Sequence, residues 1–90
     1  SEETCRFQIP EEGTYAVEAH FVSHSSDIAQ STTNIILNDS LLVTLQTNST
    51  KGQWVTQELR RVVLEKGCYE LQLNVMKAGL EIDQINFTLL

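Results

Sequence analysis

Apolar and polar residues alternate along much of this chain, and turn residues interrupt the alternation about every ten positions. Between Thr14 and Phe21, the odd positions are aromatic or aliphatic and most of the even positions are polar. Because successive side chains of a β-strand point to opposite faces, this pattern predicts a strand with one buried face. Helix signals are almost absent from the rest of the chain.

Seven segments carry strand signals, and residues typical of turns separate them. The expected strands cover residues 5–9, 15–21, 32–37, 41–46, 54–64, 69–75 and 85–89. In the fifth expected strand, the apolar residues change from odd to even positions between Leu59 and Val62. This change predicts a β-bulge around Arg60 and Arg61. The strand spacing predicts an all-β fold, an antiparallel and jelly-roll-like β-sandwich of about seven strands. The length suits a single domain spanning residues 1–90.

The connections between these strands predict where a binding surface lies. If each strand reverses direction, alternate connections lie at the same end of the sandwich. Short turns share one end, at residues 10–13, 38–40 and 65–67. The other end collects the connections at residues 22–30, 47–53 and 76–81. The first two of these are longer and rich in polar residues, which favours a binding surface but is equally compatible with ordinary solvated loops.

The charge distribution argues against two classes of partner. The net charge is −6, and the six cations are scattered, at Arg6, Lys51, Arg60, Arg61, Lys66 and Lys77. Nucleic-acid binding needs a clustered positive field, so we expect no nucleic-acid partner, and an anionic membrane surface is disfavoured for the same reason. No apolar run approaches the ~20 residues of a membrane-spanning helix, so no membrane partner is expected.

Two cysteines, Cys5 and Cys68, lie far apart in the sequence. A disulfide between them would close a long loop and add about 4 kcal/mol in the chain-entropy model, which suits a small secreted domain. The alternative is two separate thiols. Three N-glycosylation sequons, at Asn38, Asn48 and Asn86, are weak evidence for secretion. No signal peptide is recognisable, so the chain is interpreted as a mature or excised piece.

No combination of residues predicts catalysis. His20 and His24 lie near serines in the sequence, but catalytic triads are built from spatial neighbours, so this proximity carries little weight. The sequence has no glycine-rich phosphate loop and no histidine pair with metal-ligand spacing. We therefore expect a protein that is not an enzyme.

Two single residues each allow more than one interpretation of their role. Trp54 is the only tryptophan and stands where the 47–53 connection enters the next expected strand. Its indole could stack on a sugar, anchor an interface or fill the core, and its parity does not decide between these roles. Asp83 occupies an odd position, like Ile85 and Phe87, whose side chains are expected to point into the core. It is either a buried carboxylate that needs a partner, such as a metal, or an outward residue on a bulge.

Five segments follow one another in an informative order. They comprise a proline-containing entry to a strand, a short hairpin turn, a tryptophan that opens a strand, a strand pair turning at a glycine, and a closing strand with an aspartate. In the sequence they are Ile9–Val17, Ile36–Ser40, Gly52–Trp54, Val63–Leu71 and Ile82–Phe87. Together, over most of the chain, they resemble carbohydrate-binding modules of families 6 and 35.

The resemblance implies a β-sandwich that binds glycans through its end loops and is usually attached to a glycoside hydrolase or another secreted protein. Trp54 matches the stacking tryptophan of these modules, and Asp83 matches a ligand of their structural calcium. Glu81 stands where many members have an asparagine that contacts the ligand. Only Ser1 to Thr4 precede the first expected strand, so the usual N-terminal stretch is lacking. A second stacking aromatic and further calcium ligands therefore cannot be assigned.

These observations favour a non-catalytic, secreted carbohydrate-binding module within a larger multidomain protein, with a polysaccharide or oligosaccharide as its partner. Trp54 would stack on a sugar ring. Hydrogen bonds would come from a polar set consisting of His24, Asp27, Asn48, Lys51, Gln53 and Glu81. A structural calcium at Asp83 is the one cofactor considered. The alternative is a structural or protein-interaction β-sandwich of a larger secreted protein that does not bind sugar.

Overall fold

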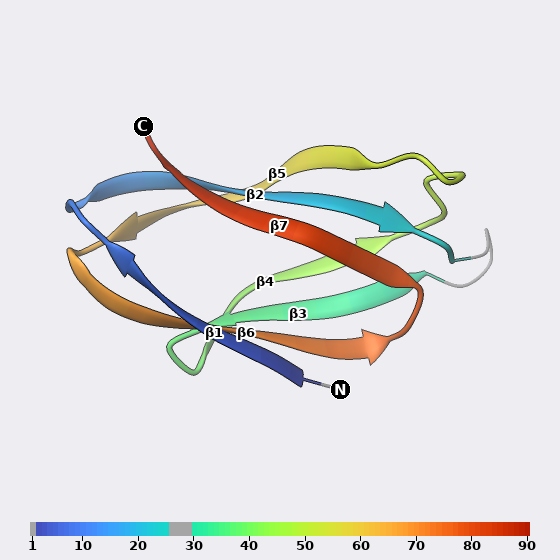
Figure 1. The fold of residues 1–90 in the computed structure, drawn as a ribbon, viewed down its shortest axis with the longest axis horizontal. Coiled ribbons are helices and arrows are strands. Elements are labelled where there is room, and N and C mark those ends of the chain that lie inside the picture. Colours follow the sequence, from blue (N-terminus) through green and yellow to red (C-terminus); the bar gives the residue numbers. More distant parts are fainter. Residues whose placement is uncertain (1, 26–29) are drawn as a thin grey trace.

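Seven β-strands make up most of the computed structural model, which describes residues 2–25 and 30–90 (Figure 1). In chain order they are β1 (Glu2–Ile9), β2 (Gly13–Ser23), β3 (Ser31–Leu37), β4 (Ser40–Thr47), β5 (Val55–Leu64), β6 (Gly67–Lys77) and β7 (Leu80–Leu89). The predicted all-β fold is confirmed, and most strands are longer than predicted. Within the described ranges, no helix is long and apolar enough to cross a membrane.

The strands form two antiparallel sheets that face each other. One sheet has four strands in the order β1-β6-β3-β4, and the other has three in the order β5-β2-β7. Every connection except the β3–β4 hairpin passes from one sheet to the other, so consecutive strands alternate between the layers. The predicted antiparallel β-sandwich is therefore confirmed.

The inward face of β2 supplies the centre of the core. Tyr15, Val17, Ala19 and Phe21 are each at most 3% exposed, as their alternation predicted. They cluster with buried aliphatic residues of other strands, including Ile35, Leu37, Leu42, Leu45, Leu64 and Leu71. Burying one such side chain contributes about 1.5–3 kcal/mol, so the interior between the sheets provides the rigid body on which the loops are mounted.

One bulge lies on β5, at Leu59. Val17 pairs with Arg60 and the next residue of β2, Glu18, pairs with Glu58, which leaves Leu59 as an extra residue. The bulge predicted around Arg60 is therefore confirmed, one position earlier in the chain. Leu59 packs against both core clusters, so the extra residue lets an apolar side chain remain inward where the parity of the strand changes.

A second bulge, on β7, decides the orientation of Asp83. His20 pairs with Gln84 and Phe21 pairs with Ile82, so Asp83 is the unpaired residue between them. Its side chain is exposed, which confirms the outward alternative and excludes a buried carboxylate. Within the described ranges, no three His, Cys, Asp or Glu residues are grouped so that they could hold a metal ion.

The register of β1 and β6 shows that the predicted disulfide is wrong. Cys5 pairs with Leu71, whereas Cys68 pairs with Gln8, and both cysteines are free and exposed. Three positions along a strand correspond to about 10 Å and to opposite faces of the sheet. A disulfide needs Cα atoms about 4.4–6.8 Å apart with converging side chains, so the two thiols cannot be bridged in this register.

Candidate functional site

The three connections predicted to share one end do meet there. The backbone N–H of His24 donates to the carbonyl of Gly79 at 2.7 Å, which joins the β2–β3 connection to the β6–β7 turn. The N–H of Thr50 donates to the carbonyl of Ser23 at 3.1 Å, which joins the β4–β5 connection to the end of β2. These two contacts bring segments far apart in the sequence into one surface.

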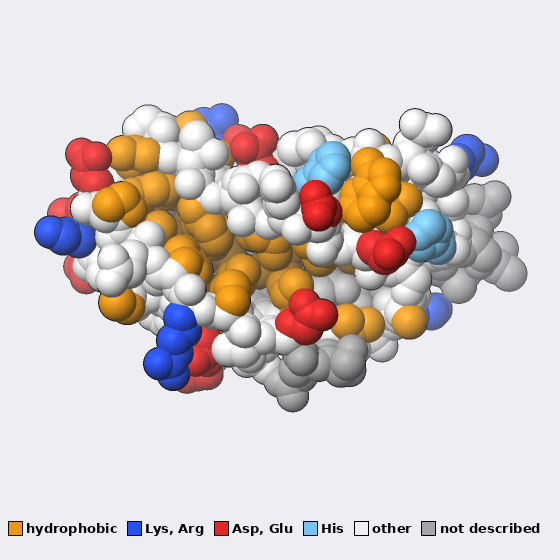
Figure 2. Space-filling model, in the orientation of Figure 1, with side chains coloured by type: hydrophobic (Ala, Val, Ile, Leu, Met, Phe, Trp, Pro, Cys, Tyr) orange, Lys and Arg blue, Asp and Glu red, His pale blue; other side chains and the backbone are white. Residues whose placement is uncertain are grey.

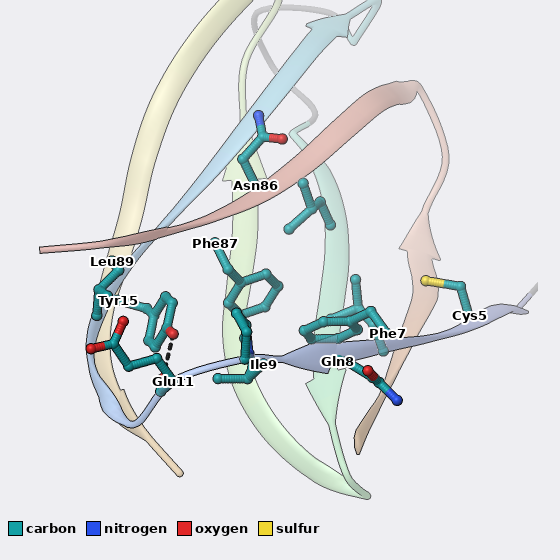
Figure 3. Close-up of a pocket in the computed structure, with 12 residues that line it drawn as sticks. Cys5, Phe7, Gln8, Ile9, Glu11, Tyr15, Asn86, Phe87 and Leu89 are labelled. Carbon is teal, nitrogen blue, oxygen red and sulfur yellow. Dashed lines mark hydrogen bonds between the residues drawn. The ribbon is translucent and has the colours of Figure 1, made fainter. Parts of the chain in front are cut away.

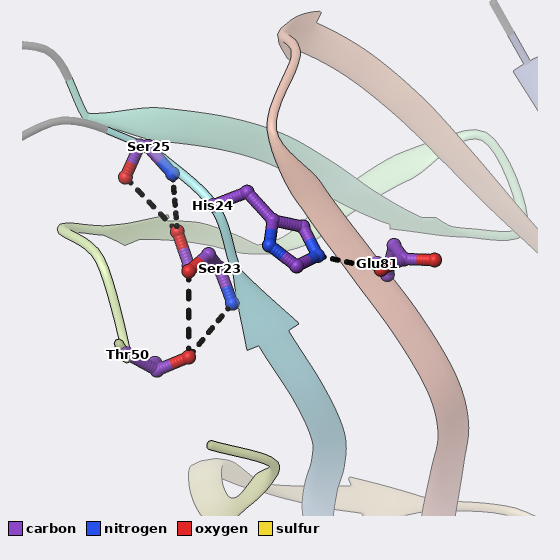
Figure 4. Close-up of polar contacts among 5 residues, drawn as sticks. All are labelled: Ser23, His24, Ser25, Thr50 and Glu81. Carbon is purple, nitrogen blue, oxygen red and sulfur yellow. Dashed lines mark hydrogen bonds and ion pairs between the residues drawn. The ribbon is translucent and has the colours of Figure 1, made fainter. Parts of the chain in front are cut away.

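Small hydroxyl side chains reinforce this end from inside (Figure 4). Ser23 is fully buried, and its N–H donates to Thr50 Oγ1 at 3.0 Å. Its hydroxyl lies 2.9 Å from that of Ser25, and Ser25 Oγ donates to the carbonyl of Thr47 at 3.0 Å. Because these hydrogen bonds satisfy polar groups away from water, they hold the backbone of the loops in one arrangement.

Gly79 is required where the β6–β7 turn approaches the β2–β3 connection. Its φ of +121° lies in a region that residues with a side chain rarely adopt. A Cβ atom at this position would collide with Ser31 Oγ, which donates to the carbonyl of Ala78 at 3.1 Å. The glycine therefore permits the close approach that places Glu81 beside His24.

Trp54 forms a partly exposed aromatic platform next to this end. Its ring stacks on that of His20, with centroids 5.3 Å apart and an interplanar angle of 16°. His20 Nδ1 lies 2.9 Å from Thr56 Oγ1, so a hydrogen bond across β2 and β5 fixes the imidazole. Trp54 is 48% exposed, which excludes the core-filling alternative and leaves part of the indole open to a ligand.

The platform lies on the outer face of the β5-β2-β7 sheet. His20 belongs to the even positions of β2, whose neighbours on the odd positions point into the core. Trp54 directly precedes Val55, which pairs with Phe21 and packs against the core. In Figure 2, histidine side chains lie on either side of a hydrophobic patch, with acidic side chains beside them.

His24 and Glu81, two of the predicted ligand-binding residues, are paired. His24 Nε2 lies 2.7 Å from Glu81 Oε2, and because an ionised carboxylate only accepts, the ring is the donor. The side chains are 55% and 64% exposed. Figure 4 shows the other carboxylate oxygen of Glu81 directed away from the ring. The pair thus holds a carboxylate in a defined orientation on an exposed surface.

The β4–β5 connection presents the remaining predicted residues. Asn48, Lys51 and Gln53 are exposed. The loop has a defined shape, because Lys51 N–H donates to Ser49 Oγ and Gln53 N–H donates to the carbonyl of Thr50, both at 3.0 Å. Asp27, the last predicted member of the polar set, lies outside the described residues.

Sequence reasoning missed the contribution of His20 and Thr56. The parity of His20 on β2 indicated its outward orientation, and that part is confirmed. Its stacking partner follows from the pairing of β2 with β5, which no local pattern reveals. The arrangement as a whole can offer one aromatic face together with hydrogen-bond donors and acceptors, all on an open surface.

Comparison with known proteins adds to this description. No family model and no curated protein sequence matches the chain. A solved β-glucosidase of Paenibacillus barengoltzii contains a region 45% identical to it, with a TM-score of 0.88, covering 94% of this chain and 9% of the enzyme.

Two further solved structures share the fold at lower identity. A family 35 carbohydrate-binding module from an environmental isolate has a TM-score of 0.78 and 21% identity, covering 98% of this chain and 65% of that module. The GH26-CBM35 β-(1,4)-mannanase of Podospora anserina has a TM-score of 0.72 and 17% identity, covering 98% of this chain and 19% of the enzyme. The chain thus spans less than two thirds of each of the three proteins.

Proposed function

Proceeding from a domain with the fold of the family 35 carbohydrate-binding modules, we propose that this chain binds a glycan and is not itself catalytic. The observation that carries the proposal is the half-exposed Trp54 ring, held flat against His20 beside the His24–Glu81 pair. Ligand sites combine apolar or aromatic side chains with a few precisely placed polar groups, and a fixed indole beside an oriented carboxylate supplies both.

The aromatic part of the site would contribute affinity by stacking. One face of a pyranose ring is lined by C–H groups, which pack on an indole and remove apolar area from water. Because His20 already supports the opposite side of the indole and is itself fixed by Thr56, less side-chain freedom is lost when the sugar arrives.

The polar part would select among sugars. The Glu81 carboxylate accepts hydrogen bonds from sugar hydroxyls, while His24 holds it in place. Asn48, Lys51 and Gln53 supply further donors and acceptors from the β4–β5 connection. Since the surface is open, we expect a dissociation constant near the millimolar range, or about −4 kcal/mol of binding free energy.

The size of the related proteins suggests the setting of this activity. In the β-glucosidase and the mannanase, the matching region is a small fraction of an enzyme. We therefore place residues 1–90 as one accessory domain of a larger protein that acts on polysaccharides outside the cell. In that setting, the domain would keep the catalytic part close to its substrate.

Affinity electrophoresis through gels containing single polysaccharides tests the proposal. The panel includes β-mannan, β-glucan, α-glucan and a uronic acid polymer. The unmodified protein should be retarded by at least one polysaccharide, and Trp54→Ala should remove the retardation. Leu41→Ala is the matched control, because Leu41 is 58% exposed and lies in β4 beside the short turn at residues 38–40. No retardation in any gel, with no heat of binding by calorimetry, would sink the proposal.

A further inference from the structure

Negative charge gathers on the outer face of the β5-β2-β7 sheet, where the Trp54 platform lies. Among the described residues, the outward positions of these three strands hold one guanidinium and four carboxylates, which belong to Arg61, Glu18, Glu58, Glu81 and Asp83. Arg61 Nε lies 3.3 Å from Glu58 Oε1, whereas Glu18 and Asp83 contact no cation in the described part of the chain. A ligand on the platform therefore meets a negative field.

The register of β2 with β7 brings Glu81 close to this platform. His20, which stacks on Trp54, precedes Val22 by two positions of β2, and Val22 pairs with Glu81. Two residues of a strand span about 7 Å and neighbouring strands lie about 5 Å apart, so the Cα atoms of His20 and Glu81 lie within about 10 Å of each other. A sugar stacked on the indole therefore has this carboxylate within reach of its own substituents or of those on the next sugar.

One oxygen of the Glu81 carboxylate is held, and the other is open to a ligand. Oε2 lies 2.7 Å from His24 Nε2, which fixes the group. Figure 4 shows the second oxygen directed away from the ring, and the side chain is 64% exposed. A hydrogen bond from an ammonium to a carboxylate is about twice as strong as one between neutral groups. The open oxygen thus favours an ammonium over a hydroxyl as its donor.

The aromatic part of the site points to the same charge. The face of an indole attracts a cation, because its ring quadrupole is negative above the plane. A carboxylate on the ligand would instead face Glu81 and Asp83, and such a like-charge contact selects against a partner. The face as a whole is therefore suited to positive sugars, acceptable to neutral ones and unfavourable to uronates.

We propose that the preferred ligand of this site is an amino sugar, whose ammonium group donates to the open oxygen of Glu81 while its ring stacks on Trp54. This assignment rests on the proposed glycan binding and narrows it to polysaccharides that contain unacetylated amino sugars. Acetylation of the amine removes the positive charge and leaves the ring unchanged, so the acetylated polymer binds more weakly. A polymer of uronic acids binds most weakly of all.

The hollow between β1 and β7 is a poorer seat for such a ligand. It has a volume of about 450 Å³, and Figure 3 shows Phe7, Ile9 and Phe87 among the residues that line it. The rings of Phe7 and Phe87 stack there, with centroids 4.9 Å apart. An ammonium that enters an apolar lining loses its hydration without an equivalent partner. Trp54 does not line this hollow, so the two locations can be distinguished by substitution.

A basic peptide carries the same charge but matches the site less well. The ammonium of a lysine stands at the end of a flexible four-carbon stem, and ordering that stem costs conformational entropy. The lysine side chain also has no flat face of C–H groups to cover the indole. An amino sugar carries its ammonium on a rigid ring, so stacking and charge pairing occur together.

Titration with hexasaccharides that differ in charge tests the assignment. The four ligands are β-1,4-linked hexamers of glucosamine, N-acetylglucosamine, glucose and glucuronic acid. Binding is followed by the fluorescence of Trp54, the only tryptophan, near pH 7, where the carboxylates are ionised and the glucosamine amines are partly protonated. The glucosamine hexamer should bind about three- to tenfold more tightly than the two neutral hexamers. Since exposed charges are screened by salt, about 0.5 M NaCl should reduce this ratio to less than about twofold.

Two matched variants separate the local carboxylate from the net charge of the protein. Glu81→Gln keeps the size of the side chain and an acceptor for His24, and it should abolish the preference for glucosamine over the neutral hexamers. Glu12→Gln removes the same charge from an exposed turn at the other end of the sandwich, and it should leave the preference unchanged. Trp54→Ala should lose binding of every hexamer, as measured by calorimetry.

The outcomes distinguish this assignment from glycan binding itself. Equal affinity for the charged and neutral hexamers, tighter binding of the glucuronic acid hexamer, or a preference that survives in Glu81→Gln would each overturn the amino-sugar assignment. A lysine hexapeptide that binds as tightly as the glucosamine hexamer would overturn it too, because charge alone would then explain the affinity. In all these cases, retardation by a neutral or acidic polysaccharide would leave the proposed function standing. If no saccharide of any charge binds, both proposals fail.

Discussion

The stack of Trp54 on His20 can be tested by a double-mutant cycle with His20→Ala, Trp54→Ala and the combined variant. Paired aromatic rings contribute about 0.5–1.5 kcal/mol beyond their buried area. Because both rings are partly exposed, we expect a coupling free energy in the lower half of this range, about 0.5–1 kcal/mol. In His20→Ala, the loss of the hydrogen bond to Thr56 adds up to about 1 kcal/mol of destabilisation.

Urea denaturation followed by circular dichroism measures the cycle, since the fluorescence of Trp54 is absent from two of the variants. For a domain of this size, each 1 kcal/mol of lost stability lowers the Tm by about 4–8 °C, so the effects are measurable. If the two single effects add to within about 0.3 kcal/mol of the double variant, the rings are not coupled and the argument for a supported platform fails.

The same variants separate stability from recognition. In His20→Ala, the indole remains but is no longer supported, so binding must order it. Ordering a side chain costs about 0.5–1.5 kcal/mol, which corresponds to an affinity about two- to twelve-fold lower. Calorimetry with the polysaccharide that retards the protein checks this value. An unchanged affinity in His20→Ala would show that the imidazole does not prepare the platform.

Three further changes test the scaffold. Phe21→Ala empties the site of a 1% exposed side chain and should cost about 3–5 kcal/mol in urea denaturation, whereas Leu41→Ala at the surface should cost less than about 0.5 kcal/mol. Gly79→Ala combines a strained φ with a collision and should lower stability by about 1–3 kcal/mol or more in thermal denaturation. A reducing agent should leave the Tm unchanged, because Cys5 and Cys68 are free; a fall would reveal a bridge.

Local patterns predicted much of the fold because a half-buried strand imposes a period of two on its sequence. The inward residues of β2 show this, from Tyr15 to Phe21. The orientation of Asp83 could not be decided in the same way. Its outward position depends on the register of β7 against β2, where Phe21 pairs with Ile82, and that register is a property of two strands together.

The sequence predicted which end of the sandwich holds the candidate site, but it did not predict the contacts between the side chains there. Alternating strand directions are sufficient to bring the connections that hold His24 and Glu81 to one end. Their hydrogen bond, between residues 57 positions apart, depends on the close approach at Gly79. The stack of Trp54 on His20 likewise depends on the pairing of β5 with β2. The disulfide prediction failed for a related reason, since the number of residues between two cysteines does not determine their register.

The hydrogen bonds that hold the loop end have a consequence for how recognition can evolve. The loop backbone is fixed by main-chain groups and by the small hydroxyls of Ser23 and Thr50. The exposed side chains of Asn48, Lys51 and Gln53 project from that backbone. Under the proposed function, substitutions at these three positions therefore change the preferred ligand while the loops keep their shape. The domain is suited to diversification, with one inherited scaffold presenting many different surfaces.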